Sequence, residues 1–134
     1  MERKNKNRGF RKLIVWQDAI ELYVIANEVL SVCNYKYTKS VANTLDACQS
    51  VSRNIAEGYC RKGIKEYLQF LNFAIASAGE FHSEIYSFYK AKLIREIDFE
   101  KMDRLLFKIE NQMIRLIEKL KQNRDSGNWE DSYL

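Results

Sequence analysis

The sequence predicts an all-α protein, an antiparallel up-down-up-down four-helix bundle. The 134 residues include no proline and only five glycines, so the two strongest breakers of helices are scarce. Four stretches place apolar residues at the three- and four-residue steps of an α-helix. The connections between these stretches are short, which makes consecutive helices antiparallel neighbours.

The first helix is expected at residues 13–31, and the second begins after a break around Asn34. Thr38 or Ser40 is the expected N-cap of the second helix, and Gly58 is expected to take the left-handed position after its last turn. The expected inward faces are Trp16, Ala19, Ile20, Tyr23, Ala26 and Leu30 in the first helix, and Val41, Leu45, Cys48, Val51 or Ser52, and Ile55 in the second.

The third helix, over residues 64–93, is the longest and would extend roughly 45 Å at 1.5 Å per residue. Asp98 is the expected N-cap of the fourth helix, which shows the most regular heptad. The expected inward faces are Ile64, Leu68, Leu71, Ile75, Ala78, His82, Ile85 and Tyr89 in the third helix, and Met102, Leu106, Ile109, Met113, Leu116 and Leu120 in the fourth.

The third helix carries more apolar residues than its inward face needs. The additional ones are Phe70, Phe73, Phe81, Tyr86 and Phe88. We expect some of them to face another subunit, because exposed aromatic patches of this size are uncommon on monomers. The alternative is a wide apolar face on a helix that is buried between two neighbours.

The chain divides into a basic flexible arm at residues 1–12, the bundle at 13–122 and a polar C-terminal tail at 123–134. The arm has a net charge of +5 and the rest of the chain −1, out of +4 in total. No stretch is apolar enough for a signal peptide or a membrane span, so we expect a cytoplasmic protein that does not contact a membrane. Cys48 is expected in the core, and Cys33 and Cys60 are expected to be reduced thiols.

No pattern typical of catalysis is present, so we expect no enzyme, no cofactor and no metal site. His82 is the only histidine, and no glutamate stands three residues before it, as the di-metal sites of helical bundles require. No glycine-rich phosphate loop occurs. Glu57, Glu80 and Glu84 are carboxylates that can meet between the second and third helices, but helix-face pairing, such as Glu57 with Arg61, explains them without catalysis.

Two groups of basic residues are candidates for binding the phosphates of RNA or DNA. Tyr59, beside the second group, is a candidate for stacking on a base. The alternative is a solvated tail and a solvated turn, which are common on soluble proteins. The candidates are Arg8, Arg11 and Lys12 in the arm, and Arg53, Arg61, Lys62 and Lys65 around the turn after the second helix.

Three segments carry a resemblance to a known family: FRKLIVWQDAIEL, SVSRNIAEGYCRKGIKEYLQFLNFAIAS and IENQMIRLIEKLK. Over residues 10–122 the chain resembles the bacterial four-helix-bundle proteins encoded in intervening sequences of 23S ribosomal RNA genes. The most specific elements are V-W-Q at residues 15–17 and N-I-A-E-G at residues 54–58. The family-motif residues expected to be structural are Trp16, Gln17, Asn54, Glu57 and Gly58.

The resemblance implies a ring-shaped homopentamer, a suspected nucleic-acid role and no catalytic residues. It also implies a distant relation to the accessory variability protein of retroelements, which serves a reverse transcriptase. The chain departs from the family pattern before N-I-A-E-G, where Asn43, Leu45 and Asp46 stand in place of glutamine and paired arginines. The sequence therefore predicts a non-enzymatic oligomer that binds RNA or DNA through phosphates. The alternative is a protein-interaction scaffold or an accessory subunit of an RNA-handling enzyme, such as a reverse transcriptase.

Overall fold

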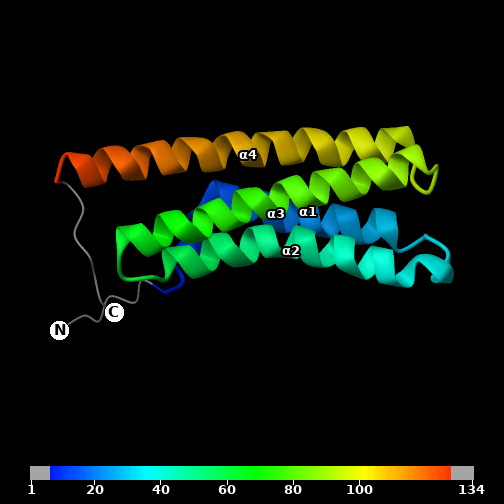
Figure 1. Cartoon of the computed structure of the whole chain (residues 1–134), viewed down its shortest axis with the longest axis horizontal. Helices are drawn as coiled ribbons and strands as arrows, with labels where there is room; N and C mark the ends of the chain where they lie inside the picture. Colours follow the sequence, from blue (N-terminus) through cyan, green and yellow to red (C-terminus); the bar gives the residue numbers. More distant parts are fainter. Residues whose placement is uncertain (1–6, 128–134) are drawn as a thin grey trace.

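The computed structural model describes residues 7–127 and confirms the all-α, up-down-up-down bundle (Figure 1). Four α-helices follow one another, and no strand occurs between residues 7 and 127. Two short 3-10 helices, η1 and η2, precede α1 and α2. The elements are η1 (Gly9–Lys12), α1 (Ile14–Leu30), η2 (Tyr35–Tyr37), α2 (Thr38–Tyr59), α3 (Ile64–Lys90) and α4 (Glu96–Asp125).

Each helix packs against two neighbours. Helix α2 lies between α1 and α3, and α4 closes the bundle by packing against α3 and α1. The most extensive of these contacts is that between α2 and α3. Because consecutive helices are antiparallel, the start of α1, the α2–α3 turn and the end of α4 lie at one end of the bundle (Figure 1).

The core confirms most of the predicted apolar faces. Met102, Leu106, Ile109 and Met113 of α4 are fully buried, as the heptad predicted. In α1 the buried face is rotated relative to the predicted one: Leu22, which we did not place inward, is fully buried, whereas Ile20, which we did, is exposed. The buried residues of α2 are Thr44, Ala47, Cys48, Val51, Ser52, Ile55 and Gly58.

The predicted inward face of α3 was partly wrong. Phe81 and Phe88, which we expected outside it, are buried, whereas His82 is half-exposed. The predicted positions, with His82 and Tyr89, and the buried ones, with Phe81 and Phe88, both follow helical spacing. Because α3 packs more extensively against α2 than against α4, we infer that the buried face is the one turned toward α2. Of the five additional aromatic residues, only Phe73 and Tyr86 are exposed.

Gly58 is not the left-handed residue that we expected after α2. It lies inside the helix, one residue before its end, and the only positive-φ residues described are Lys92 and Gly127. A Cβ atom at Gly58 would lie 2.8 Å from the Cβ of Phe70 and 3.1 Å from Cδ1 of Tyr67. The glycine therefore allows α2 and α3 to approach closely, which explains its place in N-I-A-E-G.

Several predicted boundaries moved. Helix α2 begins at Thr38 itself, after Tyr37 at the N-cap, and α4 begins at Glu96, so that Asp98 lies in the first turn and is not the cap. Asp98 instead accepts a 3.0 Å hydrogen bond from Nε of Arg95. Residues 9–12, predicted as flexible arm, form η1, and α4 continues to Asp125. Residues 1–6 of the predicted arm and 128–134 of the predicted tail lie outside the described residues.

The cysteines are unpaired, and Cys48 is buried in the core as predicted. Burial raises the pKa of the Cys48 thiol to about 12. None of the described helices combines the length and the hydrophobicity that a membrane span requires.

Candidate nucleic-acid interface

The turn between α2 and α3 is a compact corner. The backbone amide of Cys60 donates to the carbonyl oxygen of Ala56 at 3.1 Å. The backbone amide of Arg61 donates to the carbonyl oxygen of Gly58, also at 3.1 Å. These bonds tighten the last turn of α2 and use carbonyl groups that a helix end leaves without partners. The corner consequently presents Arg61, Lys62 and Lys65 from a well-defined backbone.

The described part of the arm packs against this corner. The Cys60 thiol, whose pKa is raised by burial, donates to the carbonyl oxygen of Asn7 at 3.1 Å. Gly9 lies so close to the Tyr59 hydroxyl that a Cβ atom at residue 9 would collide with it. Phe10 packs edge-on against Tyr59, with ring centroids 6.4 Å apart. The structure thus brings the two predicted basic groups together at one end of the bundle.

The V-W-Q residues hold the arm from the other side. The ring of Trp16 lies 5.1 Å from that of Phe10, and Nε2 of Gln17 donates to the carbonyl oxygen of Arg11 at 2.7 Å. Because these contacts involve the backbone and Phe10, the Arg11 and Lys12 side chains stay exposed. Trp16 and Gln17 are therefore placed to position the arm.

Asn54 and Gly58 of N-I-A-E-G lie in the neighbouring α2–α3 contact, and Glu57 pairs with Arg61 in the turn that follows. The side-chain amide of Asn54 donates to Oγ of Ser50 at 2.9 Å, and that hydroxyl lies 2.8 Å from Oγ of Ser77 on α3. Glu57 accepts a 3.0 Å hydrogen bond from Arg61, which confirms the predicted pair. These contacts are consistent with the structural role that we expected.

The basic side chains of the interface differ in how far their charges are engaged. Nη1 of Arg53 lies 3.6 Å from Oδ1 of Asp46. Nη2 of Arg61 lies 3.0 Å from Oε1 of Glu57, and the Arg61 guanidinium carbon lies 4.7 Å from the centroid of the Phe70 ring. Both arginines are exposed, so these ion pairs contribute little and compete only weakly with a phosphate. No ion pair within residues 7–127 engages Arg8, Arg11, Lys12 or Lys65.

Tyr59 does not fit the role of a stacking platform. It is half-buried, and its ring packs edge-on against both Phe10 and Tyr67, whose centroid is 6.0 Å away. The ring thus joins the arm to the corner. The interface offers charge without an exposed aromatic platform at this position.

The end of α4 adds basic residues that the sequence reasoning missed. Lys119, Lys121 and Arg124 belong to the last two turns of α4, at the same end of the bundle as the α2–α3 turn (Figure 1). Only the antiparallel direction of α4 brings this segment to that end, although a cluster of basic residues in the last turns of a helix is visible in the sequence.

His82 lies away from this interface, between α3 and α4. Its Nε2 atom is 3.1 Å from Oδ1 of Asp103, and its ring lies beside Phe99. Burial raises the pKa of the neighbouring Glu110 carboxyl. The charge of His82 acts in the opposite direction but is the smaller effect. His82 thus has a carboxylate partner on the neighbouring helix α4.

A family model described as 23S rRNA-intervening sequence protein matches residues 11–115. The chain belongs to this family. The match covers α1, α2, α3 and the first two-thirds of α4, and so includes both motifs and the corner. Arg8 and the last turns of α4 lie outside it. Among curated proteins, none matches the chain significantly.

Proposed function

We propose that this member of the 23S rRNA-intervening sequence protein family is a non-enzymatic oligomer that binds RNA or DNA through phosphate contacts. One observation carries the proposal: the described part of the arm, residues 7–12, packs against the α2–α3 corner, so Arg8, Arg11 and Lys12 share one end of the bundle with Lys62 and Lys65. Lysine and arginine side chains on one surface are the usual means of contacting a phosphate backbone.

The contacts are to phosphates and not to bases. Within residues 7–127 the candidate side chains belong to η1, to the α2–α3 turn and to the ends of helices, and not to a helix or ribbon of the kind that reads base edges in a groove. Binding through phosphates depends steeply on salt. For four contacts to a single strand, the affinity falls roughly 50-fold between 50 and 200 mM salt.

Oligomerisation would multiply these contacts. Phe107 and Ile114 are 66% and 46% exposed, and their seven-residue spacing places them on one face of α4. Large apolar side chains exposed on one face are typical of subunit contacts. An assembly that repeats the basic end several times binds a long strand far more tightly than one copy does.

The test compares two triple variants of the full chain. The first, Arg11→Gln with Lys12→Gln and Lys65→Gln, removes exposed charges from the basic end. The matched control, Lys39→Gln with Lys90→Gln and Lys101→Gln, removes three exposed charges from the opposite end. We expect the first variant to reduce the slope of log affinity against log salt by about 2 for single-stranded RNA, whereas the control changes it little.

Equal losses in the two variants would mean that only net charge matters, and the basic end would then have no special role. RNA and DNA strands of the same sequence, single and double, are measured side by side to identify the preferred polyanion.

The alternative function is a protein scaffold or an accessory subunit of an RNA-handling enzyme. The exposed Phe107 and Ile114 favour it, because an apolar helix face can bind a partner protein as well as a second copy. A stoichiometric protein partner that remains bound after nuclease treatment, together with indifference to every nucleic acid, would support this function and exclude the first.

A further inference from the structure

A pocket opens between α2 and α3 at the end of the bundle opposite the basic surface. It has a volume of about 360 Å³, which lies within the usual range of small-molecule sites. The residues that line it are Tyr37, Ser40, Asn43, Thr44, Glu84, Ser87, Phe88, Ala91 and Leu93. The first four belong to η2 and α2, and the others to α3 and the loop that follows it.

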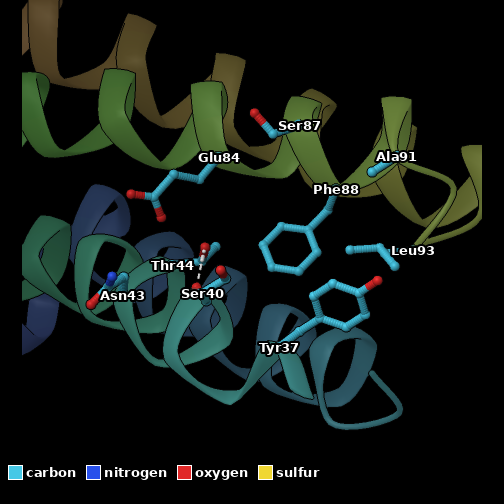
Figure 2. A pocket seen from close by; sticks show the side chains of 9 residues that line it. All are labelled: Tyr37, Ser40, Asn43, Thr44, Glu84, Ser87, Phe88, Ala91 and Leu93. Atoms are coloured by element: carbon cyan, nitrogen blue, oxygen red, sulfur yellow. Dashed lines mark hydrogen bonds between the residues drawn. The ribbon is translucent and has the colours of Figure 1, made fainter. Parts of the chain in front are cut away.

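The lining has an apolar side and a polar side. Figure 2 shows the rings of Tyr37 and Phe88 beside Leu93, while Glu84 reaches from α3 toward Asn43 and Thr44 of α2. Apolar walls with a few convergent polar groups are the usual composition of sites for small organic ligands.

Glu84 is the unusual member of this lining. Its Oε2 atom is buried and has no hydrogen-bond partner in the part of the chain that the structure describes. The Thr44 hydroxyl, on α2, donates to the carbonyl oxygen of Ser40 at 2.9 Å (Figure 2). A buried carboxylate oxygen is costly where hydrogen bonds do not fully replace the water that it has lost.

The electrostatic surroundings increase this cost. Burial raises the pKa of the Glu84 carboxyl, and a hydrogen bond with the Thr44 side chain lowers it. The Glu80 carboxylate one turn earlier raises it further, through its charge and through a side-chain hydrogen bond. No lysine or arginine within residues 7–127 forms an ion pair with Glu84. Two neighbouring carboxylates without a cation make the pocket negative, so a bound cation would be attracted by both.

We propose that this pocket binds a small organic ammonium ion that carries an aromatic group. The ammonium group lies at Glu84, where it supplies hydrogen-bond donors to the carboxylate. The aromatic group packs against Phe88, Tyr37 and Leu93. The site is independent of the nucleic-acid interface, because the two lie at opposite ends of the bundle (Figure 1).

The test is a titration of isotopically labelled full-length protein with 2-phenylethylammonium, followed by amide chemical shifts. The neutral isostere 2-phenylethanol is titrated in parallel. We expect saturable shifts confined to residues 37–44 and 84–93, and an affinity for the amine roughly tenfold higher than for the alcohol. Equal affinities, shifts elsewhere or no saturation below the solubility limit of the amine would overturn the proposal.

Two variants separate the buried carboxylate from general electrostatics. Glu84→Gln is expected to reduce the affinity for the amine roughly tenfold and to leave that for the alcohol within about twofold. Glu80→Gln removes the same charge one turn away, outside the pocket lining, and is expected to change the affinity for the amine by less than about threefold. Equal losses in the two variants would assign the effect to general electrostatics and contradict the proposed site.

Discussion

Gly58 offers a quantitative test of the α2–α3 contact, because a second helical glycine provides its control. In Gly58→Ala the new methyl carbon would lie 2.8 Å from the Cβ of Phe70 and 3.2 Å from the carbonyl oxygen of Tyr67. Ordinary contacts between carbon atoms are about 3.5 to 4.0 Å, so the helices must separate by roughly 0.7 Å. A different rotamer of Phe70 cannot relieve this contact, because the Cβ atom is fixed to the backbone.

Gly79 lies in the middle of α3, where a Cβ atom would meet nothing within 4 Å. Both glycine-to-alanine changes gain helix propensity of about 1 kcal/mol. Only Gly58→Ala also incurs an overpacking cost, of about 1 to 3 kcal/mol. We therefore expect Gly79→Ala to stabilise the protein by about 0.5 to 1 kcal/mol, and Gly58→Ala to be less stable than Gly79→Ala by about 1 to 3 kcal/mol.

The assay is urea unfolding followed by circular dichroism, at one protein concentration because oligomerisation affects apparent stability. If Gly58→Ala stabilised the protein as much as Gly79→Ala does, the close approach of α2 and α3 at Gly58 would be wrong.

Three further predictions concern the arm, Glu84 and α4. Gly9→Ala adds a Cβ atom that collides with Tyr59, so it should displace the arm and weaken RNA binding roughly threefold to tenfold without any change in charge; unchanged affinity in an anisotropy titration would exclude a role for the docked arm. Since the folded-state pKa of Glu84 is raised above 4.5, the folded protein binds this proton more tightly than the unfolded chain, and its stabilising contribution is lost as pH rises through the folded pKa. Urea unfolding should consequently show Glu84→Gln gaining stability relative to the natural protein as the pH rises above 4.5 and through the folded-state pKa, and the opposite trend would contradict the raised pKa. Phe107→Glu should lower the mass of the assembly in light scattering, whereas Ile97→Glu, on another face of α4 and similarly exposed, should not; equal masses for Phe107→Glu and the natural protein would remove Phe107 from the subunit contact.

The sequence predicted the number and order of the helices because helical periodicity is a local property. The expectation that the third helix is the longest was wrong, because α4 has 30 residues and α3 has 27. The rotation of α3 was harder to predict, since Phe81 and His82 both satisfy the heptad spacing, and packing against α2 decides between them. Gly58 was misplaced for a related reason. A glycine near the end of a helix usually marks its C-terminus, and only the position of Phe70 on α3 shows that this one is needed for packing.

The candidate interface was predicted as two separate groups of residues. Their meeting depends on contacts such as that between Cys60 and Asn7, which are 53 residues apart in the chain. No periodicity or motif reports such a contact. The pocket at Glu84 escaped prediction likewise, because Tyr37, Thr44 and Glu84 come together only when α2 and α3 pack side by side.

The most direct test of the proposed function is the affinity of the full-length protein for a labelled single-stranded RNA at 50 and 200 mM salt. Fluorescence anisotropy should show saturable binding at 50 mM and a Kd at least roughly 50-fold weaker at 200 mM, because four phosphate contacts give about this factor and an assembly that makes more contacts gives a larger one. No binding at 50 mM, or a Kd that does not change with salt, would contradict recognition of nucleic acid through the basic end.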